Sequence, residues 1–257
     1  MKMTLEQYIL NPMGKKNAVL NATAREAIRS DYMKRYAQVM MREHSNIKFY
    51  LYQDSKHNKY VGHFRIPSET VNKFYYDVVL EFTADENVEE SGTNLFKYNC
   101  RFFSNDPAFV YTYANVFNND DLFITQLKPK MSKIALKQKP EEKNPSNVVG
   151  YVKTIYFAYL FMKARNMNNT VNFGSTASKL VYKDLLMNIE DADDKIKKRQ
   201  EEGNRQSKIK ARENLRKKQK EEHHKQMESS NIKTKMNSVG VIKPKAKIKG
   251  SKSNRKS

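Results

Sequence analysis

The sequence lacks several features that define common protein classes. It has one cysteine, Cys100, no tryptophan, and only eight glycines in 257 residues. One thiol cannot close an internal disulfide, which excludes a disulfide-stapled scaffold, and its apolar neighbours favour a small buried hydrophobe. With so few glycines, a glycine-rich phosphate-binding loop is not expected. No apolar run approaches about 18 residues, so neither a membrane-spanning helix nor a signal peptide is predicted.

Aromatic residues and acids are scarce in the C-terminal quarter. All 15 Tyr and all 13 Phe precede Lys195. Residues 195–257 carry 22 Lys or Arg against 6 Asp or Glu, whereas residues 1–194 carry 26 against 22. A segment without aromatics and with high net charge cannot bury enough apolar surface to offset chain entropy. The composition therefore predicts a compact domain over residues 1–190, a charged helical arm over 191–228 and a disordered basic tail over 229–257.

Apolar residues in the predicted domain recur at two different spacings, one typical of helices and one typical of strands. A capping box at Thr4 and Gln7 opens a short helix, and apolar spacing of three and four predicts further helices over 21–43, 132–138, 146–162 and 175–189. Period-two patterns predict strands over 47–52, 60–66, 71–83, 95–103, 108–117 and 122–124. Short turns join these strands. The fold class predicted is α+β, a mostly antiparallel five- or six-stranded sheet flanked by helices.

No catalytic motif stands out. The sequence has no Walker loop, dinucleotide turn or nucleophile elbow, and its five histidines lack metal-site spacing, so no catalytic residue, metal or cofactor is assigned. The alternative is a metal-dependent nucleic-acid-processing enzyme that uses Asp77, Glu69 and Glu81. A restriction-type site needs a Lys two residues after the strand acid, and Thr83 stands there instead. The pattern favours a pair of exposed acids on a solvent face.

Aromatic residues on the predicted strands offer two interpretations. They could form an exposed platform that stacks bases next to strand cations, although aromatics at strand spacing more often form the core. The signature of an RNA-recognition motif is absent. The platform would draw on Tyr50, Tyr52, Tyr60, Tyr75, Phe96, Tyr98, Tyr111 and Tyr113, near Lys48, Arg65, Lys97 and Arg101.

The strongest signal is electrostatic. Residues 229–257 carry nine Lys or Arg and no acid, so the tail should bind polyanions by counterion release, with affinity that falls steeply as salt rises. Without aromatics to stack bases, this binding should be independent of sequence, with DNA as the first candidate. Docking on an acidic protein surface and a simple solubility role remain alternatives. The predicted phosphate contacts are Lys243, Lys245, Lys247, Lys249, Lys252, Arg255 and Lys256.

Residues 63–69, 75–82 and 102–113 resemble proteins encoded by bacteriophages with AT-rich genomes. The resemblance covers about residues 47–165. It implies a non-enzymatic virion or assembly protein, located in the host cytoplasm or the virion. It further implies other virion proteins as partners, while a second copy of this chain is another candidate. No membrane partner is expected.

Overall fold

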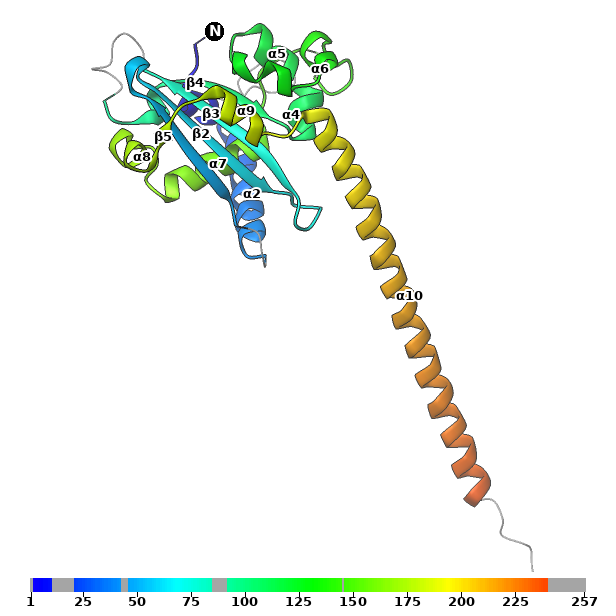
Figure 1. The fold of residues 1–257 in the computed structure, drawn as a ribbon. Helices are drawn as coiled ribbons and strands as arrows, with labels where there is room; N and C mark the ends of the chain where they lie inside the picture. The colour runs from blue at the N-terminus through cyan, green and yellow to red at the C-terminus, as the bar shows by residue number, and fades with distance from the viewer. Residues whose placement is uncertain (1, 11–20, 43–45, 85–91, 145, 240–257) are drawn as a thin grey trace, which may run out of the picture. The chain divides into compact units, whose positions relative to one another are not determined.

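Five strands form one mixed sheet with helices against both faces (Figure 1). The computed structural model describes residues 2–10, 21–42, 46–84, 92–144 and 146–239, with side chains as far as residue 227. The strand order is β4-β3-β2-β1-β5, in which only the β1/β5 pair is parallel. This arrangement confirms the predicted α+β class. The strands are β1 (Lys48–Asp54), β2 (Lys59–Pro67), β3 (Tyr75–Thr83), β4 (Asn99–Ser104) and β5 (Ser178–Lys179).

The described N-terminal residues form helices α1 (Leu5–Leu10) and α2 (Ala22–Met40). Helix α1 begins at the predicted capping box: Gln7 N donates to Thr4 Oγ1 at 3.0 Å, and Thr4 N donates to Gln7 Oε1 at 2.9 Å. Helix α2 is capped by Asn21, whose side chain accepts from Ala24 N. Both satisfy backbone donors that a helix start leaves unpaired.

The core lies between the sheet and α7 (Lys153–Ala164), which contacts β2 and β3. Alternate strand residues point toward this helix because side chains of a strand alternate between faces. Phe64, Leu80 and Phe102 are fully buried there. A second layer, α9 (Tyr182–Asn188) and the first turn of α10 (Ala192–Val239), lies against the other face, where Leu185 and Ala192 are buried.

The predicted strand over 108–117 is wrong. This segment forms α4 (Pro107–Thr112) and α5 (Ala114–Asn119). Asp106 caps α4, because its Oδ1 accepts from Ala108 N at 2.7 Å, and Pro107 occupies the first turn, where its missing N–H is harmless. The cap outweighs the strand preference of the aromatic residues that follow.

Other boundaries differ from the prediction. The predicted strand over 71–83 begins at 75, and residues 95–97 form a 3-10 turn before β4. The helix predicted from 146 begins at Lys153, and that over 132–138 is α6 (Lys133–Lys137). Residues 122–124 make only an isolated bridge, Phe102 to Phe123. The helix predicted over 175–189 is divided into α8 (Thr170–Thr176), β5 and α9.

Helix α10 continues through the predicted arm. Residues 229–239, which were predicted to be disordered, also belong to this helix. The chain divides into two compact units, residues 1–204 and 205–257. No helix in the described part of the chain has both the length and the apolar character needed to cross a membrane.

Candidate nucleic-acid interface

The arm presents an exposed and strongly basic helical surface. Every side chain over residues 207–227 is exposed. Residues 205–227 carry nine Lys or Arg against three Glu. The helix therefore keeps a surplus of positive charge in water, where it can interact with phosphate.

Four cations recur on this helix at four-residue spacing: Lys208, Arg212, Arg216 and Lys220. We call them the basic stripe. Successive members rise by about 6 Å along the helix axis and turn by roughly 40°, so they share one face. Glu213, three residues before Arg216, is the only acid at helical spacing from any of them. The surplus charge is therefore concentrated on this face.

The other lysines of this stretch have acids close by. Lys210, Lys217, Lys218 and Lys225 each have a Glu three or four residues away, the spacing at which helical side chains form ion pairs. Pairs of this kind leave little net charge for a ligand. The basic stripe is thus the surface that best suits a line of phosphates.

Apolar residues on the arm are too sparse for a helical partner. Ile209, Leu215 and Met227 are about half exposed. Their separations of six and twelve residues do not repeat the three- and four-residue steps of a coiled-coil seam. The arm is better suited to an ionic ligand than to a second apolar helix.

The predicted phosphate contacts of the tail, Lys243, Lys245, Lys247, Lys249, Lys252, Arg255 and Lys256, lie outside the described residues. The basic stripe was not singled out from the sequence, although its four-residue spacing could have revealed it.

Two acids of the alternative metal site, Asp77 and Glu81, are buried, contrary to the expectation of an exposed pair. Asp77 is 2 % exposed and Glu81 is 1 % exposed. Their strand face is covered because α9 and the start of α10, more than a hundred residues later in sequence, pack onto it. Burial on both faces also explains why β3 has buried residues at seven consecutive positions.

Asp77 belongs to a buried hydrogen-bonded pair. His63 Nε2 lies 2.9 Å from Asp77 Oδ1, and Asn105 Nδ2 donates to Asp77 Oδ2 at 2.8 Å. Burial acts to raise the pKa of Asp77, but the hydrogen bond and charge of His63, with the charge of Lys195 and the bond from Asn105, outweigh it. The pKa of Asp77 consequently lies below its ordinary value. Asp77 is a satisfied structural anion.

Glu81 and Glu69 belong to other networks. Glu81 accepts from the hydroxyl of Tyr182, and Lys59 Nζ lies 3.7 Å from its Oε1. Glu69 pairs with Lys153, and Arg35 Nη1 lies 3.7 Å from its Oε2. The three acids thus do not share one site. Within the described ranges, no group of three or more His, Cys, Asp or Glu could hold a metal ion.

The aromatic platform does not form on the sheet. Tyr60, Phe96 and Tyr98 are buried in the core, as the alternative interpretation expected. Tyr50 and Tyr111 are 44 % and 47 % exposed, and Tyr111 lies on α4, not on a strand. The two exposed rings therefore belong to different parts of the domain.

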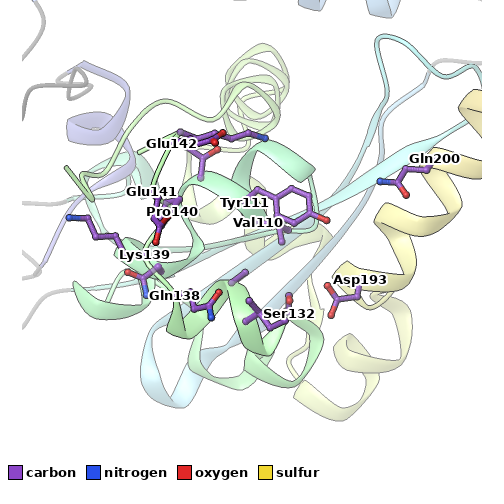
Figure 2. Close-up of a pocket in the computed structure, with 15 residues that line it drawn as sticks. Val110, Tyr111, Ser132, Gln138, Lys139, Pro140, Glu141, Glu142, Asp193 and Gln200 are labelled. Atoms are coloured by element: carbon purple, nitrogen blue, oxygen red, sulfur yellow. The ribbon is translucent and has the colours of Figure 1, made fainter. Parts of the chain in front are cut away.

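Tyr111 borders a cleft of about 1480 Å³ formed by α4, α6, residues 138–143 and the first turns of α10 (Figure 2). Lys143 Nζ lies 5.5 Å from the centre of the Tyr111 ring, within the range of a cation–π contact. These two residues are 32 positions apart in sequence, so no local pattern could have predicted the contact.

Comparison of the chain with family models, curated proteins and solved structures finds no match. The functional argument therefore rests on the chemistry of the surfaces described above.

Proposed function

We propose that this protein binds nucleic acid without sequence specificity, through the basic stripe of α10 and the lysine-rich residues that follow it. The observation that carries the proposal is the exposed, acid-poor helix over residues 207–227. The ligand is a polyanion because the arm has a surplus of cations and very little apolar surface. Backbone phosphates, which every sequence shares, supply such a ligand.

In this proposal the protein is a non-enzymatic component of a phage virion or its assembly. The folded domain contacts other virion proteins, and the arm holds packaged or replicating nucleic acid. The phage setting is taken from the sequence resemblance of residues 47–165, whereas the binding proposal rests on the charged surface of the arm. The internal pairing of Asp77, Glu69 and Glu81 gives no support to the metal-dependent alternative.

The proposal is tested by measuring the affinity for random-sequence duplex DNA at a series of salt concentrations. One full-length variant replaces all four cations of the basic stripe by glutamine, and a second replaces the seven tail cations named above. Each lost phosphate contact should lower the slope of log affinity against log salt by about 0.9. The stripe variant should therefore lose up to about 3.6 units of slope if all four cations contact phosphate.

A matched control replaces four exposed lysines of the domain, Lys34, Lys97, Lys163 and Lys183, by glutamine. It removes the same charge as the stripe variant and should retain most of the affinity. Equal loss in the stripe and control variants would overturn a localised interface. Unchanged affinity when stripe and tail are both neutralised would overturn the proposed function.

A further inference from the structure

One segment of the folded domain, residues 125–143, carries a surplus of cations. Residues 1–194 carry 26 cations and 22 acids, and residues 125–143 contain six of those cations and only two of the acids. The rest of this region is therefore balanced, with 20 of each. The segment with the surplus forms one wall of the cleft next to Tyr111.

Most of these cations face solvent. Lys128, Lys133, Lys137, Lys139 and Lys143 are exposed, whereas Lys130 is half-buried and lies 3.4 Å from Asp191. Lys139 and Lys143 line the cleft itself. Lysines beside an exposed aromatic ring are a combination that proteins use to hold a single strand, because the cations contact phosphates and the ring stacks with a base.

The acids of the cleft decide which part of the ligand enters. Glu141, Glu142 and Asp193 line it together with uncharged polar residues such as Gln138 and Ser132 (Figure 2). Carboxylates repel phosphate but accept hydrogen bonds from the N–H groups of bases. A phosphate-dense duplex is therefore disfavoured inside the cleft. An unstacked base fits beside the carboxylates, with its phosphates held by the lysines that line the cleft, Lys139 and Lys143.

We propose that this cleft binds a single-stranded segment of nucleic acid, with one base stacked on Tyr111 and adjacent phosphates at Lys139 and Lys143. The inference rests on the proposed function and extends it, since the arm supplies general affinity while the domain recognises unpaired bases. The cleft differs from the arm because it is selective for single strands.

The chain contains no tryptophan, so Tyr111→Trp in the full-length protein introduces a single indole reporter at the cleft. The probes are a short oligothymidylate and the corresponding oligouridylate, each with a fluorescent label that reports total binding by anisotropy. We expect quenching of the indole emission as the oligonucleotide binds. The matched control, Tyr50→Trp, places the reporter at a residue of similar exposure on β1 and should show no quenching.

A second variant tests the energetics. Tyr111→Ala should weaken binding of the single strand about five-fold or more, the lower range for loss of one base–aromatic stack, and should leave duplex binding unchanged. Because the Tyr111 side chain is half exposed, this variant should fold normally, which thermal melting would verify. Quenching by only one of the two oligonucleotides would support the cleft and identify DNA or RNA as its ligand.

The results separate this inference from the proposed function. If anisotropy shows full binding while emission of the Tyr111→Trp variant is unchanged, the cleft is not a site and the arm proposal stands. Equal quenching in the Tyr50→Trp control would also overturn the cleft. If no variant binds either oligonucleotide or duplex, both proposals are overturned.

Discussion

Replacing Asp77 by alanine is expected to lower the free energy of unfolding by about 2–6 kcal/mol, because two buried groups lose their acceptor and each unsatisfied group costs about 1–3 kcal/mol. The side chains of His63 and Asp77 are 0 % and 3 % exposed. Alanine would leave His63 Nε2 and Asn105 Nδ2 without their acceptor.

Urea unfolding followed by tyrosine fluorescence measures this cost in the domain alone, because all 15 tyrosines lie at or before residue 182. The control is Asp31→Ala on α2. Its ion pair with Arg35 is 2.8 Å long, slightly shorter than the His63–Asp77 contact, but both side chains are about half exposed. Exposed pairs contribute about 0–1 kcal/mol. Equal losses in the two variants would refute the argument that burial makes the Asp77 pair important.

The same pair predicts the sign of a pH effect. The pKa of Asp77 is lower in the folded than in the unfolded chain, so its contribution is present above the unfolded value of about 3.9 and is lost as pH falls through the folded value. The difference in unfolding free energy between the wild type and Asp77→Ala should therefore narrow below about pH 4. A difference that widens in this acid range would contradict the lowered pKa.

Two further substitutions test packing and capping. Gly150→Ala would place a Cβ 2.6 Å from the Tyr113 ring and should lower the free energy of unfolding by about 1–3 kcal/mol, measured by thermal or urea unfolding. Gly174→Ala is the control, because its Cβ meets only a flexible side-chain amide, and it should lower this free energy less. The reverse order would refute the packing argument. Thr4→Ala removes the acceptor of Gln7 N and should cost about 1 kcal/mol in urea unfolding. Thr4→Ser should retain most of this stability, and equal losses would show that the cap does not stabilise α1.

Features fixed by neighbouring residues could be predicted from the sequence. The capping box at Thr4 depends on contacts three residues apart, and the β1–β2 hairpin follows period-two patterning on both sides of a turn. The helices within residues 108–117 could also have been predicted from nearby residues. Val110, Ala114 and Phe117 are buried at steps of four and three residues, and the Asp-Pro pair before them is a helix start.

Features fixed by distant segments could not be predicted. The alternation of Asp77, Val79 and Glu81 correctly placed these residues on one strand face. It did not show that α9 would cover that face, because nothing in the strand encodes a partner more than a hundred residues away. Glu69 was grouped with the metal-binding acids for the same reason: its partner in the fold, Lys153, is distant in sequence.

The distribution of charge links the fold to the proposed functions. Burial of an unpaired charge is costly, and two buried acids of the folded domain have internal partners, Asp77 with His63 and Glu81 with Lys59. Side chains over residues 207–227 are exposed, so their surplus charge is balanced by small counterions, and release of these ions drives binding. Salt should therefore weaken the contribution of the arm far more than base stacking at Tyr111. Affinity for a single strand that persists at high salt should accordingly be the part removed by Tyr111→Ala.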